Sequence, residues 1–217
     1  MSTAVSNDAL GDADPSAPAF RTLHALRIKG FAKVEVIAEI ADIPVVDAHE
    51  HLVALQLSEL TVFREPRALW QLTPAGREAH ARMLSEDVAG AADLRQLQAP
   101  YRSFLRLNDE LKTLCGRWQL RAGELNDHGD ARYDGLVIGD LVHLHGRAVP
   151  VVEDMAHAVS RLGAYGRRLG EACQRFAGGE TNMFTGVMCG SYHDVWMELH
   201  EDLILSQGIE RAAEGSF

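Results

Sequence analysis

The sequence predicts a mainly α-helical protein in which β-structure is confined to one hairpin near the N-terminus. Three observations lead to this fold class. Apolar residues recur at helical spacing through most of the chain. Two short β-prone runs, LTVFRE and ALWQLT, stand on either side of Glu65-Pro66-Arg67, which has the composition of a turn. Beyond residue 84 no clear strand alternation is visible, so the rest is expected to be helical.

The first domain is expected at residues 20–84, behind an acidic leader (residues 1–19) whose composition is typical of disorder. The stretch FRTLHALRIKGFA places apolar residues close to helical spacing, and Gly30 marks the end of that helix. A second helix with one apolar stripe is predicted for KVEVIAEIADI.

Pro44 suits the first turn of a third helix, expected over residues 45–59. The hairpin follows, and Thr73-Pro74 is a favourable N-cap and N1 pair for a fourth helix, PAGREAHARML. Helix, helix, turn, helix, two-stranded wing, helix is the order of a winged helix-turn-helix domain. The segment LTPAGREAH also resembles the strand-to-helix junction after the wing in MarR-like bacterial regulators. This resemblance implies the fold, whereas winged helices serve both DNA binding and protein interaction.

DNA binding would place the third helix in the major groove and the wing against the neighbouring backbone or minor groove. The candidate DNA-binding residues on the helix and the wing are His49, His51, Gln56, Arg64 and Arg67. Residues 20–83 are neutral, with 8 basic and 8 acidic residues, but the charge of the second and third helices argues against this use. The formal net charge of the chain is -10, and residues 34–63 contain six acids and no Lys or Arg. A helix of this composition would face the DNA polyanion with negative charge.

Residues 85–217 are expected to form an all-helical domain. One long helix, or a pair broken at Pro100, covers LRQLQAPYRSFLRLNDELKTLCGRWQL. Three more helices are expected over residues 134–145, 151–162 and 165–176, and GSYHDVWMELHEDLILSQGI forms the last. The apolar stripe of this last helix predicts a homodimer.

Polar and aromatic residues gather in two stretches of this domain, NDHGDARYD and SYHDVWMELHED. Three interpretations stay open: helix caps and pairs within the bundle, a divalent metal site, or a pocket for a small-molecule effector. No HExxH or comparable compact triad is present, so no metal or other cofactor is assigned. The candidate ligand-binding residues are Trp118, Asn126, Asp127, His128, Tyr133, Tyr192, His193, Trp196 and His200.

The segments LRIKGFA, WQLR, LNDHGDARYD and SYHDVWMELHEDLI are also similar to a module of actinobacterial proteins. That module occurs alone, as a MarR-like regulator, and as the C-terminal part of some pyruvate phosphate dikinase-like, PEP-utilising proteins. The resemblance spans nearly all of the chain beyond residue 20. It implies a regulatory or docking role, and the activity of a dikinase is not carried over, because the nucleotide-binding and phosphohistidine parts of that enzyme are not in this sequence.

Several classes of protein are excluded by the sequence. No apolar run approaches the ~18–20 residues of a membrane span, and the first residues lack the basic and apolar regions of a signal peptide. Three widely spaced cysteines, Cys115, Cys173 and Cys189, are expected to be reduced and buried, as in the cytoplasm. No GxSxG, P-loop or GxGxxG motif occurs, so an enzyme is not expected.

Two functions are compatible with these features. The first is a one-component transcriptional regulator, in which a dimer binds operator DNA through its winged helices under the control of a small-molecule effector in the helical domain. The second is a subunit that does not bind DNA and docks onto a PEP-utilising dikinase-like enzyme or another protein.

Overall fold

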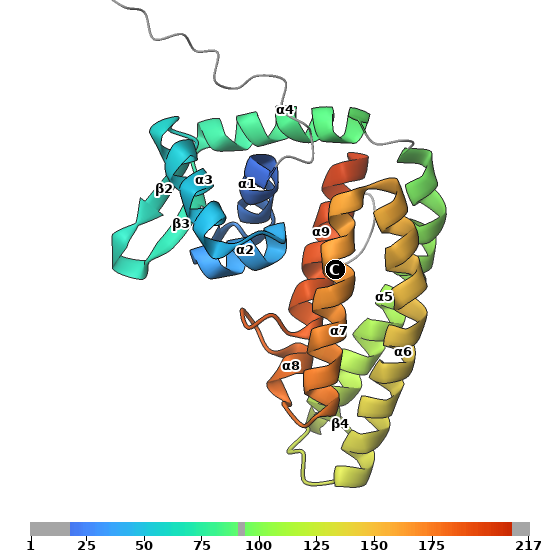
Figure 1. Ribbon diagram of the computed structural model, residues 1–217. Coiled ribbons are helices and arrows are strands. Elements are labelled where there is room, and N and C mark those ends of the chain that lie inside the picture. The colour runs from blue at the N-terminus through green and yellow to red at the C-terminus, as the bar shows by residue number, and fades with distance from the viewer. Residues whose placement is uncertain (1–17, 91–93, 210–217) are drawn as a thin grey trace, which may run out of the picture. The chain divides into compact units, whose positions relative to one another are not determined.

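The computed structural model of the chain describes residues 18–90 and 94–209. The chain divides into two compact units, unit 1 (Met1–Gly90) and unit 2 (Ala91–Phe217). Both units are mainly helical, as Figure 1 shows. Unit 1 also contains a small antiparallel sheet of three strands. Within the described ranges no helix combines the length and the apolar character needed to cross a bilayer.

Unit 1 alternates helices with short strands. In chain order its elements are α1 (Pro18–Lys29), β1 (Phe31–Ala32), α2 (Val34–Ala41), α3 (Val45–Leu57), β2 (Thr61–Arg64), η1 (Glu65–Arg67), β3 (Leu69–Leu72) and α4 (Pro74–Gly90). β2 and β3 form the expected hairpin around the single 3-10 turn η1, and β1 pairs with the other edge of β3. α4 continues to Gly90, beyond the PAGREAHARML stretch that predicted it.

Local signals in the sequence explain where these elements begin and end. Gly30 follows α1 with a φ of +77°, a conformation that glycine adopts without strain. Thr73 caps α4, because its Oγ1 accepts a hydrogen bond from the backbone N–H of Gly76 at 3.0 Å. The backbone carbonyl of Leu60 approaches Gly76 so closely that an added Cβ would lie 1.9 Å from its oxygen. Only glycine therefore fits at this junction.

The core of unit 1 is formed by one face of each of the first three helices and by the inner face of the sheet. Side chains alternate along β3, so that Trp70 and Leu72 are buried while Leu69 and Gln71 are half-buried. The fully or almost fully buried members of this core are Leu23, Ala25, Leu26, Ala32, Ile37, Ile40, Ala41, Leu52, Trp70 and Leu72. Trp70, at 4% exposure, is the largest of them.

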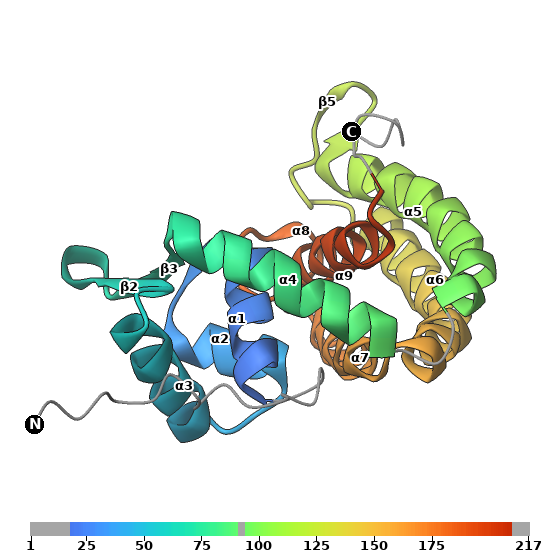
Figure 2. The same ribbon diagram turned by 90° about the horizontal axis from the view of Figure 1, so that it is seen from above.

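Unit 2 is built on four long helices, α5 (Gln98–Gln119), α6 (Ala131–Ala158), α7 (Gly163–Ala177) and α9 (Tyr192–Gln207). Each one reverses the direction of the one before it, and the view in Figure 2 shows them side by side. The shorter elements are η2 (Leu94–Leu97), β4 (Leu120–Arg121), β5 (Glu124–Leu125), η3 (Ser160–Leu162) and α8 (Asn182–Thr185). One continuous hydrophobic core runs between the long helices.

Two prolines of unit 2, Pro100 and Pro150, lie within helices. The separate helices predicted at residues 134–145 and 151–162 are wrong, because α6 runs without a break through Pro150 to Ala158, and Ser160–Leu162 form η3. Pro150 is exposed, so water can satisfy the carbonyl that loses its N–H donor to the proline ring. Pro100 lies in the first turn of α5, where its missing N–H has no helical partner to lose.

A small hairpin, β4–β5, joins α5 to α6 and is the exception to the all-helical prediction for this domain. Its turn is Ala122-Gly123, with positive φ at both residues, the backbone of a two-residue type I′ turn. Each strand has only two residues, too few for alternation to be visible in the sequence. Asp130 then caps α6 by accepting from the backbone N–H groups of Arg132 and Tyr133, as expected of this polar segment.

Candidate functional site

The three residues predicted to contact DNA from α3 have different surroundings in the structure. His49 and Gln56 are exposed. His51 is half-buried, and its Nδ1 lies 3.1 Å from Oγ1 of Thr22 on α1. One ring nitrogen of His51 is thus engaged inside unit 1, which leaves His49 and Gln56 as the accessible members of the set.

The two arginines predicted for the wing lie on the exposed hairpin. Arg64 ends β2 and donates from Nε to Oε1 of Gln71 on β3 at 3.3 Å. Arg67 is in η1, next to Ala68, which closes the turn with a left-handed backbone. Both cations are exposed, and Arg64 is partly held against its own sheet.

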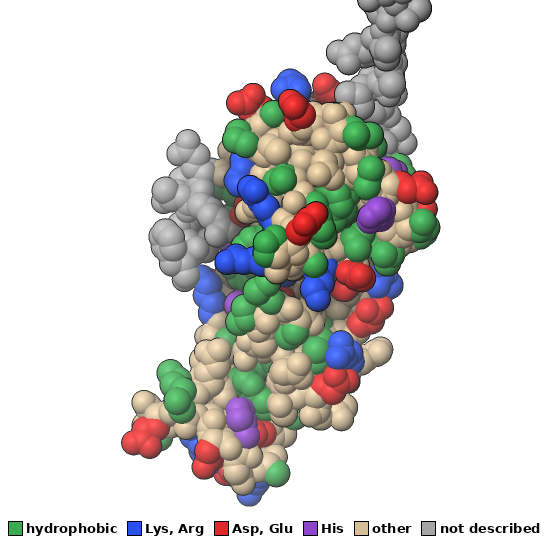
Figure 3. Space-filling model, turned by 90° about the vertical axis from the view of Figure 1, so that its left-hand side faces the viewer, with side chains coloured by type: hydrophobic (Ala, Val, Ile, Leu, Met, Phe, Trp, Pro, Cys, Tyr) green, Lys and Arg blue, Asp and Glu red, His purple; other side chains and the backbone are tan. Residues whose placement is uncertain are grey.

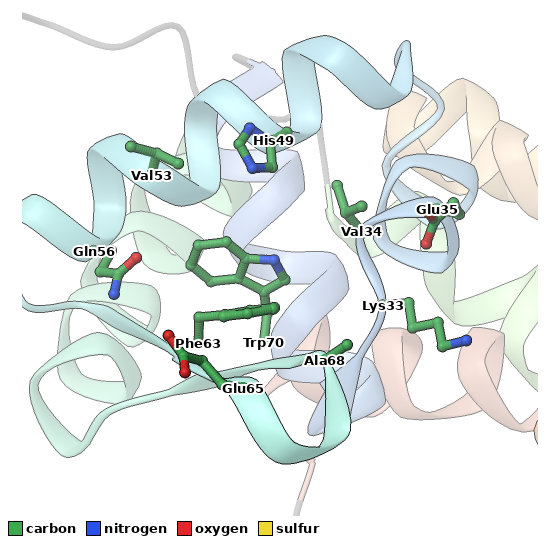
Figure 4. A pocket seen from close by; sticks show the side chains of 10 residues that line it. All are labelled: Lys33, Val34, Glu35, His49, Val53, Gln56, Phe63, Glu65, Ala68 and Trp70. Carbon is green, nitrogen blue, oxygen red and sulfur yellow. The ribbon is translucent and has the colours of Figure 1, made fainter.

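A pocket of about 610 Å³ opens between α3 and the hairpin. Its volume falls in the range of ~300–1,000 Å³ that is typical of ligand-binding pockets. Two of the residues predicted to bind DNA, His49 and Gln56, line it instead of projecting from a convex surface. The lining side chains, drawn in Figure 4, are Lys33, Val34, Glu35, His49, Val53, Gln56, Phe63, Glu65, Ala68 and Trp70.

The floor of the pocket is aromatic. Trp70 lies at its centre, with His49 on one side and Phe63 on the other, as Figure 4 shows. The ring centroid of Phe63 is 5.1 Å from that of Trp70, and His49 meets Trp70 edge-on at 6.3 Å. Because Trp70 is also a core residue, the floor is held by the packing of the whole unit and does not depend on a bound ligand.

The rim of the pocket carries charge of both signs with an acidic excess. Glu35 and Glu65 contribute two carboxylates from opposite sides, and Lys33 contributes one ammonium group. The pocket therefore combines an apolar floor with two acidic and one basic lining side chain.

Apolar side chains also reach the surface of α3, and one of them, Val53, lines the pocket. Val46 is 63% exposed and Leu57 is 83% exposed, and Val45 and Val53 are exposed as well. Hydrophobic side chains lie at the surface among acidic and basic ones in the space-filling view of Figure 3. Apolar side chains that are grouped at a surface beside a pocket are typical of interaction sites.

The sequence alone does not reveal this pocket, because its aromatic floor is formed only when the two strands of the hairpin pair. Phe63 and Trp70 belong to β-prone runs in which aromatic residues are ordinary. Only the pairing of β2 with β3, which sets Phe63 opposite Trp70, brings the two rings together below α3. The available signal was the apolar character of Val45, Val46 and Val53 on the face where a DNA-reading helix carries polar side chains.

In unit 2 the structure brings one part of the predicted ligand-binding set together at the β4–β5 end of the bundle. The Asn126 amide donates to the backbone oxygen of Trp118 at 3.1 Å and to Oδ1 of Asp134 at 3.0 Å. Nδ1 of His128 lies 2.9 Å from Oδ2 of the same Asp134, and its ring packs on Trp118 with centroids 4.3 Å apart. Tyr133 donates to the backbone oxygen of Arg117.

Asp134 is the organising residue of this cluster and was not among the predicted site residues. A carboxylate in the first turn of α6 was the signal that could have identified it, since such positions favour negative charge. The remaining predicted residue of this stretch, Asp127, is exposed and accepts from the backbone N–H of Gly129 at 2.9 Å. These contacts fasten the α5–α6 connection to the bundle.

The second part of the predicted set lies in the core of unit 2. Trp196 stacks on Phe104 with centroids 4.6 Å apart, and its indole N–H donates to Oδ1 of Asn108 at 3.0 Å. Tyr192 and His200 are buried beside it, and His193 is half-buried. Burial raises the pKa of the Tyr192 phenol. The indole N–H and its partner Asn108 form a satisfied pair inside the apolar core.

Metal binding was one of the interpretations left open by the histidines and carboxylates of unit 2. Over residues 18–90 and 94–209, no group of three or more His, Cys, Asp or Glu side chains is arranged so that it could hold a metal ion.

The three thiols differ in exposure, and the prediction that all are buried is wrong for Cys189. Burial raises the pKa of Cys115 to about 11 and also raises the pKa of Cys173. We expect iodoacetamide at neutral pH to alkylate Cys189 first, because Cys189 is exposed and the raised pKa of the other two thiols lowers the fraction present as thiolate, the reacting form. Peptide mass spectrometry of a time course measures the three rates. Equal rates at Cys173 and Cys189 would contradict this, and unfolding in urea should equalise them.

Comparison of the chain with known protein families, with curated proteins and with solved structures finds no match in any of the three.

Proposed function

We propose that unit 1 is a winged helix that binds a segment of a partner protein in the pocket between α3 and the hairpin. The order of its helices and strands, with a hairpin between α3 and α4, supports the winged-helix assignment. The observation that carries the docking role is the aromatic floor of Trp70 and Phe63, which opens on the face where such a domain would read DNA.

The surface of α3 supports docking over DNA recognition on energetic grounds. A helix in the major groove needs donors and cations, because base edges and phosphates are polar and the backbone is anionic. The exposed side chains of α3 include three valines, Val45, Val46 and Val53, and the acidic Glu50, while Asp47 is half-buried. Contact of these apolar groups with a protein partner is favourable, because it removes them from water.

Operator binding is the second candidate, supported by Arg64 and Arg67 on the exposed hairpin. Both arginines would have to offset the negative charge of α2 and α3. The effector-binding and dimeric roles proposed for unit 2 on sequence grounds belong to this second candidate and stay predictions.

Two measurements on the full chain separate the candidates. The first is fluorescence anisotropy with labelled duplex DNA from the region upstream of its own gene, at two salt concentrations. We expect no specific binding at micromolar protein and low salt. Specific, salt-sensitive binding that disappears in the Arg64→Ala/Arg67→Ala double variant would establish the DNA-binding regulator and contradict the docking role.

The second measurement places a photo-crosslinking amino acid at Gln56, on the rim of the pocket, in cells of the source organism. We expect one defined protein to be crosslinked, and expect Phe63→Ala to abolish that product while the fold is retained. The same crosslinker at the exposed Glu78 of α4 is the matched control. A PEP-utilising dikinase-like enzyme is the partner that the sequence resemblance puts forward for identification by mass spectrometry. Products that persist in Phe63→Ala would contradict docking in the pocket.

A further inference from the structure

We infer that the segment bound between α3 and the hairpin is basic, with Lys or Arg side chains on either side of an apolar anchor. This inference rests on the proposed docking function and adds the chemistry of the partner. It follows from three properties of the pocket: its floor, its charge and the placement of its two carboxylates.

The floor requires an apolar anchor in the partner. Phe63 and Val53 are exposed enough to be covered, and Trp70 closes the space beneath them. A volume of about 610 Å³ exceeds what one small polar group needs, so a hydrophobic side chain with part of its backbone fits the space. Buried aromatic and aliphatic anchors of this kind commonly dominate the binding energy of an interface.

The charge of the surroundings selects a cationic partner. Of the charged side chains that line the pocket, Glu35 and Glu65 are acidic and Lys33 is basic. A concave site lined by one predominant sign of charge raises the local concentration of ligands of the opposite sign. An acidic segment or a nucleic-acid backbone would instead be repelled.

The positions of Glu35 and Glu65 indicate where the cations lie. The two carboxylates come from α2 and from η1, on opposite sides of the aromatic floor, as Figure 4 shows. Lys and Arg have long alkyl stems that can cover apolar surface while the charged end stays in water. A basic residue on each side of the anchor can therefore pass over Phe63 or Val53 and end near one carboxylate.

The experiment begins from an unbiased display library of 12-residue peptides selected against the immobilised full chain. We expect the enriched peptides to carry net positive charge around a central apolar residue. Binding of one fluorescein-labelled enriched peptide is then measured by anisotropy for the wild type and its variants. In Glu35→Gln/Glu65→Gln the Kd should rise about fivefold, since exposed ion pairs each change affinity only a few-fold. Added salt should weaken peptide binding to the wild type more than binding to this variant.

Two further variants make the outcomes distinguishable. Glu78→Gln, an exposed carboxylate on α4, is the charge-matched control and should leave the Kd unchanged. Phe63→Ala removes part of the floor and should weaken the binding of every peptide that occupies the pocket. If the enriched peptides are neutral or acidic and their binding is lost in Phe63→Ala, the inference of a basic partner is wrong, but docking in the pocket is supported. If no peptide is enriched, or if the enriched peptides bind Phe63→Ala as tightly as the wild type, both the basic partner and docking in the pocket are contradicted.

Discussion

Replacing Trp196 with alanine should lower the free energy of unfolding of unit 2 by about 3–5 kcal/mol, the usual effect of removing a buried large aromatic side chain. Trp196 is 1% exposed, and the change removes its stacking on Phe104 and leaves Oδ1 of Asn108 without its donor. Both losses act in the same direction, because the core forms a cavity and a buried polar atom loses its partner.

The neighbouring Met197→Ala is the matched control, since Met197 is on the same helix and 37% exposed. Its effect should stay within about 0.5 kcal/mol. Hydrogen exchange followed by mass spectrometry is the suitable measurement, because peptides from α5 and α9 report unit 2 separately from unit 1. Equal protection of these peptides in the two variants would show that Trp196 does not stabilise the core.

Replacing Gly76 with alanine should destabilise unit 1 by about 1–3 kcal/mol or more, the range of overpacked positions. The added methyl group would lie 1.9 Å from the carbonyl oxygen of Leu60, a backbone atom that cannot rotate away. That carbonyl also accepts from the backbone N–H of Thr73 at 3.0 Å, so any displacement weakens the junction that holds α4 to the hairpin.

Gly139→Ala is a control for which we expect the opposite effect on stability. Gly139 lies inside α6 with nothing within 4 Å of the position of an added Cβ. Alanine there should stabilise unit 2 by about 0.5–1 kcal/mol through its higher helix propensity. Hydrogen-exchange protection of peptides from α1 and α4 reports the change in stability of Gly76→Ala. Protection of peptides from α6 reports that of the control. Unchanged protection in Gly76→Ala would mean that the backbone at Leu60 relaxes without cost.

Much of the helical order could be predicted because its signals are local. Gly30, Thr73 and Asp130 each mark a helix end through their own backbone or side-chain chemistry, and the structure has an end at each of them. The two helices predicted on either side of Pro150 are one helix in the structure, because Pro150 is exposed and water can satisfy the hydrogen bond that the helix loses there.

The candidate site could not be predicted, because it depends on contacts between segments far apart in the sequence. His51 was expected to face DNA, yet it meets Thr22, 29 residues earlier in the chain. Likewise, NDHGDARYD and SYHDVWMELHED look alike in composition, but one fastens a connection at the surface and the other fills a core. Residue type alone did not separate these roles, whereas burial in the folded chain did.

Trp70 belongs at once to the core of unit 1 and to the floor of its pocket. A partner that binds only the folded pocket therefore adds its binding free energy to the stability of unit 1, about 2.7 kcal/mol at a concentration one hundred times its Kd. In a cell, chains without a partner would unfold more often and be degraded sooner. The amount of this protein would then follow the amount of its partner, without any control of transcription.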